Sequence, residues 1–332
     1  MKDWVEKARR PEVLGGLGGF AGLFDASALK AYERPLLATS TDGVGTKVAI
    51  AQALDKHDTI GFDLVGMVVD DLVVCGAEPL FMTDYIATGR VVPERIAAIV
   101  QGIAEACAEA GCALVGGETA EHPGLLAPDE YDVAGATTGV VEASRLLGAD
   151  RVRPGDVVVA MASSGLHSNG YSLVRHVLLA EGGRSLAEHV DDFGRSLGEE
   201  LLEPTRLYTL PCLELARSTG VHAMSHVTGG GLAANLERVL PATVAATVDR
   251  ATWALPPVFE LVQRVGGVEL TELERTLNCG VGMVALMPAD EADAAVRLLG
   301  SHGIPAWPAG EVTAAAGDAG GRVTLVGQHA AS

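Results

Sequence analysis

The sequence predicts an α/β protein, and three observations lead to that class. Runs typical of strands alternate along the whole chain with segments of helical periodicity. Residues 93–110 give the clearest helix, because Pro93 opens an amphipathic stretch and Gly111 stands just past its end. Glycine-rich loops follow predicted strands in both halves, and loops in that position bind ligands in many α/β proteins.

Each predicted element has its own local signal. Turn residues bound the apolar runs, whereas the helices carry apolar residues at i, i+3 and i+4. The predicted strands are 35–41, 79–88, 113–115, 131–142, 157–162 and 283–287. The predicted helices are 2–9, 59–76, 93–110, one from 171, a long helical region at 197–217, and 232–239, 253–265 and 290–299. A turn at 151–156 places the domain boundary near residue 150, which gives domains 1–150 and 151–332.

The composition indicates a globular chain with a strong acidic excess. Its 332 residues are enough for two cores, and 48% of them are hydrophobic. The net charge of −19 argues against duplex nucleic acid and against an anionic membrane surface, because both need a basic face. No apolar run reaches the roughly 18 residues of a membrane span. The five cysteines form no Cys-x-x-Cys pair, so we expect reduced thiols in a cytoplasmic protein.

The most informative stretch is the loop at 41–47, with the sequence Thr-Asp-Gly-Val-Gly-Thr-Lys. Two glycines one residue apart let the backbone approach a ligand closely, although such a pair is more often a plain turn. The carboxylate, hydroxyls and ammonium of the loop suit a phosphate bound together with a divalent cation. The order of residues fits neither the P-loop of ordinary NTPases nor a dinucleotide-binding fingerprint.

Carboxylates at three places are candidate metal ligands. Asp63 and Asp70 lie seven residues apart on one face of the predicted helix 59–76, and Asp71 lies beside Asp70. Buried carboxylates must be paired or bind metal, although a solvated helix face is the alternative. Asp42 and Glu118 each follow a predicted strand, so two strand ends and one helix could together hold one or two Mg²⁺. Lys47 would then be a point charge for a phosphate oxygen, or simply a lysine at a helix start.

Two loops in the second half favour an anion. The loop at 163–172, Ser-Ser-Gly-Leu-His-Ser-Asn-Gly-Tyr-Ser, follows a strand and opens a helix, which suits a sugar phosphate. His167 could donate to that phosphate or act as an acid or base, whereas Ser168 and Asn169 could simply cap the helix. The loop at 228–231, Thr-Gly-Gly-Gly, is of the same kind, and His226 before it is a weak candidate.

At these residues the chain resembles the phosphoribosylformylglycinamidine cyclo-ligase family, also called aminoimidazole ribonucleotide synthetases, of purine biosynthesis. The resemblance extends over nearly the whole chain in the family's order. The matching segments are 10–20, 41–47, 57–61 with 63–65, 76–81, 116–124, 163–175, 228–231 and 278–283.

The resemblance implies a homodimer of two-domain subunits whose N-terminal halves form a barrel-like interface, each followed by a C-terminal α/β domain. It implies that ATP binds in a cleft reached by both domains and that Mg²⁺ is the metal. The implied reaction is the ATP-dependent closure of formylglycinamidine ribonucleotide to aminoimidazole ribonucleotide, with ADP and phosphate as the other products. Phosphoryl transfer of this kind relies on positioning and charge neutralisation.

The resemblance also implies roles for individual residues, read together with the loops above. Asp42, Asp71 and Glu118 are the expected metal ligands, with Asp70 as a further candidate, and Lys47 and His167 are the expected catalytic residues. The expected ATP or phosphate contacts are Gly18, Gly19, Asp42, Gly43, Gly45, Thr46, Lys47, Gly117 and Thr119. The expected substrate contacts are Ser164, Gly165, His167, Ser168, Asn169, Gly229 and Gly230.

The chain departs from the family at two points. Members are expected to carry a further segment before the equivalent of Trp4, and Asp70 stands where asparagine is expected. Related enzymes share the superfamily fold, among them selenophosphate synthetase, which generally needs an early cysteine or selenocysteine. The first cysteine here is Cys75, which argues against that activity. The alternative to an enzyme is a non-catalytic dimer that binds ATP without turning it over.

Overall fold

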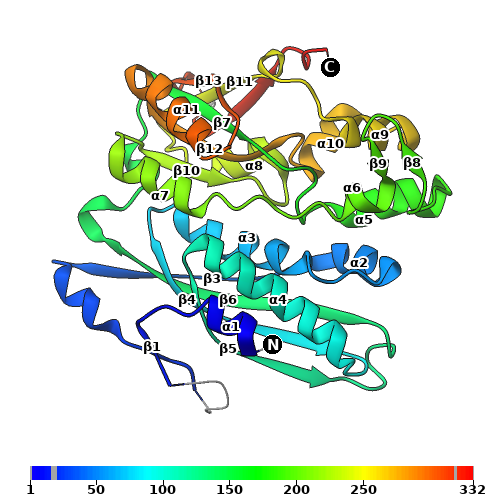
Figure 1. The fold of residues 1–332 in the computed structure, drawn as a ribbon. Coiled ribbons are helices and arrows are strands. Elements are labelled where there is room, and N and C mark those ends of the chain that lie inside the picture. The colour runs from blue at the N-terminus through cyan, green and yellow to red at the C-terminus, as the bar shows by residue number, and fades with distance from the viewer. Residues whose placement is uncertain (1, 16–20, 318–319, 332) are drawn as a thin grey trace. The chain divides into compact units, whose positions relative to one another are not determined.

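The structure is a computed structural model, which describes residues 2–15, 21–317 and 320–331. The chain divides into two compact units. Unit 1 comprises Met1–Leu146 together with Pro204–Leu210, and unit 2 comprises Leu147–Glu203 together with Pro211–Ser332. Each unit contains a sheet and several helices (Figure 1), so the predicted α/β class is confirmed.

Unit 1 is built on a four-stranded sheet of order β3-β6-β4-β5. The pairs of β6 with β3 and β4 are antiparallel, whereas β4 and β5 are parallel. The strands are β1 Val13–Leu14, β2 Leu23–Phe24, β3 Pro35–Gly43, β4 Glu78–Thr88, β5 Ala113–Glu121 and β6 Tyr131–Glu142. The helices are α1 Lys2–Lys7, η1 Ala26–Ala31, η2 Gly45–Lys47, α2 Val48–Leu54, α3 Ile60–Val73, α4 Pro93–Ala110 and η3 Ala143–Arg145.

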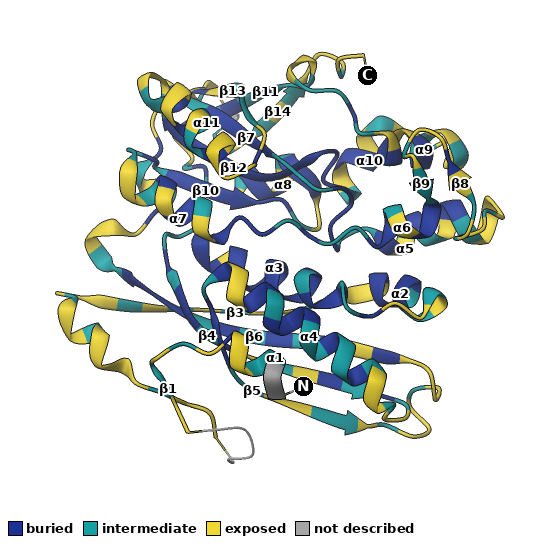
Figure 2. Cartoon of the chain, in the orientation of Figure 1, coloured by how far each residue is buried: buried dark blue, intermediate teal, exposed yellow. Residues whose placement is uncertain are grey.

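Helices α3 and α4 lie along one face of this sheet (Figure 1). They approach closely at Gly61 and Gly102, since a Cβ atom on Gly61 would lie 1.9 Å from the backbone nitrogen of Ile103. Most of α3 is buried (Figure 2), and its buried side chains include Asp63 and Asp70 among the apolar residues. The opposite face of the sheet is open within the unit, because Leu37 and Tyr85 are 64% and 41% exposed there.

The register of the strands assigns each side chain to a face. Asp42 pairs with Gly135, Gly135 with Asp84, and Asp84 with Gly117, so these residues share one face. A Cβ atom on Gly135 would lie 3.3 Å from Leu64 of α3, which identifies that face as the helix side.

Unit 2 is built on a six-stranded sheet of order β10-β12-β7-β13-β11-β14. Strands β7 and β12 are apolar and largely buried, because they lie in the interior of the sheet. The strands are β7 Asp156–Ala162, β8 His189–Val190, β9 Arg195–Ser196, β10 Ala223–His226, β11 Val244–Asp249, β12 Val281–Pro288, β13 Ala306–Ala314 and β14 Val323–Val326. The helices are η4 Ala149–Arg151, α5 Tyr171–Arg175, η5 His176–Glu181, α6 Leu197–Leu201, α7 Thr209–Ser218, α8 Gly231–Glu237, η6 Arg250–Thr252, α9 Pro257–Gly266, α10 Leu270–Thr276, η7 Ala289–Glu291 and α11 Ala292–Ser301.

Some predicted elements differ from the observed ones. Strand β5 continues to Glu121, so residues 116–121 are part of a strand and not of a loop. The helical region predicted at 197–217 is two helices, α6 and α7, with residues 203–208 outside any helix or strand between them. Helices α2 and α10 were not predicted, nor were strands β1, β2, β8, β9, β10, β11, β13 and β14. In the described part of the chain, no helix has the length and apolar character to cross a bilayer.

Candidate functional site

The predicted phosphate loop connects β3 to α2 in unit 1. The carboxylate of Asp42 accepts a hydrogen bond from the backbone nitrogen of Gly43 at 2.7 Å, which holds it at the strand end. Gly45 has a φ of +73°, a left-handed conformation that favours glycine, and no atom lies within 4 Å of where its Cβ would be. Asp42, Gly45 and Thr46 are exposed, so this loop has room for a ligand.

Lys47 lies elsewhere, in the interior of unit 1. Its side chain is 0% exposed, and its Nζ lies 2.7 Å from Oδ1 of Asp63. The same oxygen accepts hydrogen bonds from the backbone nitrogen of Thr205 at 3.0 Å and from its hydroxyl at 2.7 Å. Burial raises the pKa of Asp63, and Lys47 and Thr205 oppose that rise. In this conformation the ammonium binds a carboxylate, so contact with a phosphate needs the lysine to turn outwards.

Asp70, the further metal candidate, lies two turns along α3 from Asp63 and binds the same segment of chain. Its carboxylate accepts hydrogen bonds from the backbone nitrogen of Tyr208 at 3.1 Å and from the hydroxyl of Thr209 at 2.7 Å. Asp70 is fully buried, whereas its neighbour Asp71 is exposed. The two aspartates of α3 that the sequence places on one face therefore hold residues 204–210, and Asp71 remains accessible to a ligand.

The remaining predicted phosphate and metal residues of unit 1 lie on β5. Gly117 is on the helix side of the sheet, opposite Asp84, and Glu118 is on the other face, paired with Tyr85. Asp42 is on the helix side, so the register separates the carboxylates of Asp42 and Glu118 onto opposite faces. Across residues 2–15, 21–317 and 320–331, no group of three or more His, Cys, Asp or Glu side chains is placed to hold a metal ion.

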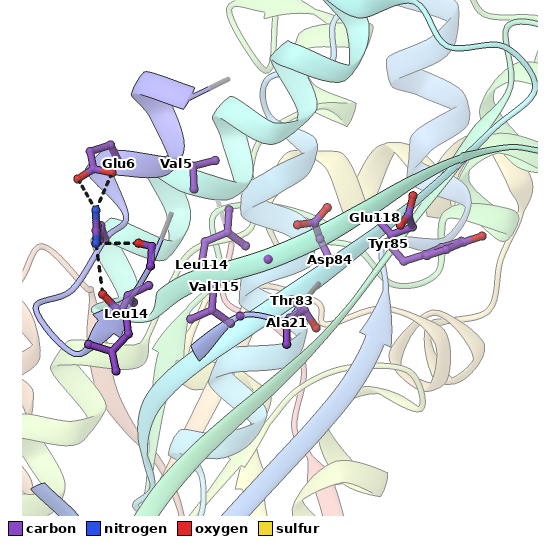
Figure 3. A pocket seen from close by; sticks show the side chains of 16 residues that line it. Val5, Glu6, Leu14, Ala21, Thr83, Asp84, Tyr85, Leu114, Val115 and Glu118 are labelled. Carbon is purple, nitrogen blue, oxygen red and sulfur yellow. Dashed lines mark hydrogen bonds and ion pairs between the residues drawn. The ribbon is translucent and has the colours of Figure 1, made fainter. Parts of the chain in front are cut away.

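A cavity of about 610 Å³ lies along β5 in unit 1 (Figure 3). Helix α1 lines one side of it, where Arg9 bonds to Glu6 at 3.1 Å and to the carbonyl of Gly15 at 2.9 Å. Asp84 and Glu118 also line the cavity. Burial raises the pKa of Asp84 to about 7. A carboxyl group that is partly neutral near pH 7 is a feature of many functional sites.

In unit 2, Asn278 joins the predicted substrate loop to the strand that follows it. Its Nδ2 donates to the carbonyl of Gly165 at 2.9 Å, and its Oδ1 accepts from the hydroxyl of Ser163 at 3.1 Å. The same Oδ1 accepts from the backbone nitrogen of Gly280 at 2.9 Å. These bonds fix the loop after β7 against the turn before β12, and so determine where the backbone of the loop lies.

His167 is held inside that loop. It is buried, and it has a φ of +59°, which is uncommon for a residue with a side chain. Its Nε2 accepts a hydrogen bond from the backbone nitrogen of Ser164 at 3.1 Å, so this nitrogen carries no proton. Strained backbone of this kind is frequent at ligand sites, because the surrounding structure must hold it. Here His167 shapes the loop, and the proton-handling role predicted for it stays a prediction.

The second glycine loop lies beside the first. A Cβ atom on Gly229 would lie 3.6 Å from Oδ1 of Asn169, and a Cβ atom on Gly170 would lie 2.2 Å from Leu277. Asn235 of α8 holds the loop from behind, since its Nδ2 donates to the carbonyl of Gly229 at 3.2 Å. The structure therefore brings the predicted substrate residues of the two loops together within unit 2.

Sequence reasoning did not predict the roles of four polar residues of these sites. Asp84 belonged to no motif, Asn278 was noted only as the start of the matching segment 278–283, and Asp63 was noted only as a candidate metal ligand on a helix face. Thr205 lies in a segment predicted to be helical. Pro204 was the one available signal there, because proline removes a backbone donor and interrupts a helix. Gly18 and Gly19, which are predicted phosphate contacts, lie outside the described residues.

Comparisons with known proteins match each half of the chain to a domain of one family. The family described as "AIR synthase related protein, N-terminal domain" matches residues 24–141. The family described as "AIR synthase related protein, C-terminal domain" matches residues 153–321. The phosphoribosylformylglycinamidine cyclo-ligase of Xanthomonas oryzae pv. oryzae is 51% identical over 320 residues, covering 96% of this chain and 93% of that protein. The chain belongs to the phosphoribosylformylglycinamidine cyclo-ligase family. The relative from Brevibacillus brevis is 49% identical over 314 residues, covering 95% of this chain and 90% of that protein.

Solved structures similar to this chain have the same fold at lower identity. The thiamine-monophosphate kinase from Stenotrophomonas maltophilia K279a has a TM-score of 0.70 and 23% identity, covering 99% of this chain and 96% of that one. The hydrogenase maturation protein HypE of E. coli has a TM-score of 0.68 and 21% identity, covering 98% and 92%. At these identities the likeness shows the fold, which the cyclo-ligase family therefore shares with proteins of other names.

Asp84 gives a pH-dependent prediction about stability. Its pKa rises from 3.8 in the unfolded chain to about 7 in the fold, so the folded state favours the neutral carboxyl. The stability that the group contributes is therefore lost as pH rises from about 4 to about 7. Asp84→Asn stays neutral, so its melting temperature relative to the natural chain should increase between pH 5 and pH 8. The same change at exposed Asp150 is the control, and an equal difference at both pH values for Asp84→Asn would contradict the assignment.

Proposed function

We propose that this chain catalyses the ATP-dependent cyclisation of formylglycinamidine ribonucleotide to aminoimidazole ribonucleotide, with ADP and phosphate as the other products. The observation that carries the proposal is the match to curated cyclo-ligases, at 48–51% identity over at least 95% of the chain. The match extends through both units, and so includes the loop at 42–47 and the paired loops around Asn278. The step belongs to purine biosynthesis.

The reaction couples two bond changes. ATP transfers its γ-phosphoryl group to the oxygen of the formyl amide, and ADP leaves. A nitrogen of the amidine then attacks the activated carbon, the carbon–oxygen bond to phosphate breaks, and a proton is lost from nitrogen. The protein's task is to hold the two substrates in line and to neutralise the charge of the triphosphate.

The loops of the two units suit the two substrates. We propose that the exposed residues Asp42, Gly45 and Thr46 of the loop contact the triphosphate through backbone amides and a hydroxyl, and that Lys47 reaches it by turning outwards. A solved structure of HypE that resembles this chain with a TM-score of 0.66 is in complex with ATP, which supports ATP as the nucleotide. The loops at 163–170 and 228–231 would hold the ribose phosphate, since their backbone is fixed by Asn278 and Asn235.

Mg²⁺ enters this proposal as the partner ion of ATP. The ion keeps several waters and takes only one or two carboxylates when phosphates are present, so no cage of protein ligands is needed. Asp42, Asp71 and Glu118 are all exposed carboxylates, which suits that chemistry. When bound, the ion neutralises charge on the phosphates.

The assignment of function is tested by supplying both substrates. Purified protein with formylglycinamidine ribonucleotide and Mg-ATP should form aminoimidazole ribonucleotide and phosphate in equal amounts, and a chelator of Mg²⁺ should abolish both. Release of phosphate without the ribonucleotide, or ATP binding without either product, would contradict the proposal and favour a member that only binds ATP.

The metal ligands are tested by titrating ATP binding against Mg²⁺. One or two of the variants Asp42→Asn, Asp71→Asn and Glu118→Gln should reduce the Mg²⁺-dependent part of ATP affinity by about tenfold, because the ion takes only one or two carboxylates when phosphates are present. Asp150→Asn serves as the exposed control. Unchanged affinity in all three variants would remove these carboxylates from the ion's coordination.

We further propose that the active form is a homodimer joined through the open face of the unit 1 sheet. Leu37 and Tyr85 of that face are large and exposed, and Thr39 and Thr41 extend the same face along β3. A partly apolar sheet face of this kind is characteristic of a protein–protein interface.

All five cysteines are free thiols, which supports a cytoplasmic location.

Substitution on this face should separate the subunits. Leu37→Arg places a charge where the proposed interface is dry, so light scattering should show a monomer in place of a dimer. Val326→Arg on β14 of unit 2 is the matched control, since Val326 is also an exposed strand residue, and it should remain dimeric. A Leu37→Arg protein that stays dimeric would place the interface elsewhere.

A further inference from the structure

The segment 204–210, which we call the strap, interrupts unit 2 in the sequence but packs as part of unit 1. Residues up to Glu203 and from Pro211 are part of unit 2, whereas Pro204–Leu210 are part of unit 1. The chain therefore passes between the units at three places. Each passage is a covalent link, so the ends of the strap cannot move independently of the unit that they enter.

One stripe of α3 holds the strap. Asp63, Gly66 and Asp70 follow at intervals of three and four residues, which places them on one side of the helix. Asp63 binds Thr205, and Asp70 binds Tyr208 and Thr209, through the bonds given above. Gly66 provides the space between them, because a Cβ atom there would lie 2.7 Å from the methyl carbon of Thr205.

The first anchor is also connected to the proposed nucleotide loop. Oδ1 of Asp63 accepts from both Lys47 and Thr205, so the last residue of the loop at 42–47 and the first anchored residue of the strap share one oxygen atom. The second anchor, Asp70, lies seven residues further along α3, about 10 Å away by the rise of an α-helix, whereas the ammonium of Lys47 lies at Asp63. If Lys47 moves towards a phosphate, the carboxylate that holds Thr205 loses its countercharge.

On the other side, the strap is continuous with the proposed substrate loop of unit 2. Glu203, two residues before Thr205, lies next to Gly165, since a Cβ atom on Gly165 would lie 3.8 Å from the Cβ of Glu203. Glu203 is itself fixed by an ion pair with Arg195. Tyr171, just after the loop, donates its hydroxyl to the carbonyl of Leu201 at 2.7 Å.

We propose that Lys47, Asp63 and Thr205 are positioning residues that couple the nucleotide loop of unit 1 to the substrate loop of unit 2 through the strap. The inference rests on the proposed function, which assigns ATP to the first loop and the ribonucleotide to the second. All the contacts lie within their own unit, and the covalent chain from Glu203 to Thr205 joins them. The coupling is a free energy between two sites, so it acts equally in both directions.

The coupling can be measured as a ratio of affinities. The dissociation constant of formylglycinamidine ribonucleotide is determined with and without the non-hydrolysable β,γ-imido analogue of ATP. In the natural chain the analogue should change that constant by about fivefold or more. Thr205→Val, which removes the hydroxyl and keeps the shape, should bring the ratio to within twofold of one, and Thr205→Ser should restore it.

Thr209→Val is the matched control. It removes a hydroxyl of the same strap that binds a buried aspartate of the same helix, Asp70. That aspartate lies two turns along α3 from Asp63, which is the one that binds Lys47. The ratio should therefore keep its natural value, even where the melting temperature falls as much as in Thr205→Val. Equal loss of coupling in both variants would mean that the strap is merely structural, and would overturn the proposal.

A second pair of variants reaches the same contact from the helix. Gly66→Ala pushes against the methyl group of Thr205 and should reduce the ratio, whereas Gly66→Ala with Thr205→Ser removes that methyl group and should recover it. This pair decides the matter if Thr205→Val fails to fold, and no recovery in the double variant would count against the proposal. A natural chain that binds both ligands without coupling overturns this inference alone. A natural chain that does not bind the ribonucleotide overturns the proposed function with it.

Discussion

The hydrogen bonds to the buried carboxylate of Asp63 are the interactions that hold the nucleotide loop and the strap in unit 1. That carboxylate accepts three donors from two distant parts of the chain, Lys47 and Thr205. Removing water from a carboxylate is costly, and only donors of this quality compensate for it. Two turns further along α3, the buried carboxylate of Asp70 likewise accepts hydrogen bonds from Tyr208 and Thr209. The mostly apolar helix α3 thus carries two polar contacts, and these fix the backbone of the strap, which lies about 140 residues later in the chain.

Asn278 has the corresponding role in unit 2, with a neutral side chain. One amide satisfies the carbonyl of Gly165, the hydroxyl of Ser163 and the backbone nitrogen of Gly280, and so fixes two loops at once. A ligand that binds backbone atoms needs those atoms to be in place before it arrives, since ordering them on binding costs affinity. The rigid loop, including the left-handed backbone of His167, is consistent with that requirement.

The sequence predicted the class of the fold and much of the chemistry, and its failures have physical causes. Helix α4 and strand β6 were predicted with their observed bounds, because local periodicity, Pro93 and Gly111 determine them. Strand β5 was too short in the prediction, since glycines at 116 and 117 look like a loop and only the partner β4 keeps them extended. The strap was predicted as helix, because its donors are satisfied by aspartates about 140 residues away, which no local pattern reveals. The ion pair of Lys47 with Asp63 was not predicted either, because only the folded chain brings the two side chains together.

The strap has a consequence for how the chain acquires its structure as it is synthesised. The strands and helices of unit 1 are complete once the ribosome has passed Leu146, yet Asp63 and Asp70 receive their backbone and hydroxyl donors only when residues 204–210 appear. Until then α3 exposes the carboxylates of Asp63 and Asp70 and the surface at Gly66, where a Cβ atom would lie 3.5 Å from Leu207. Unit 1 is therefore completed only after residues 147–203, which are part of unit 2, have left the ribosome.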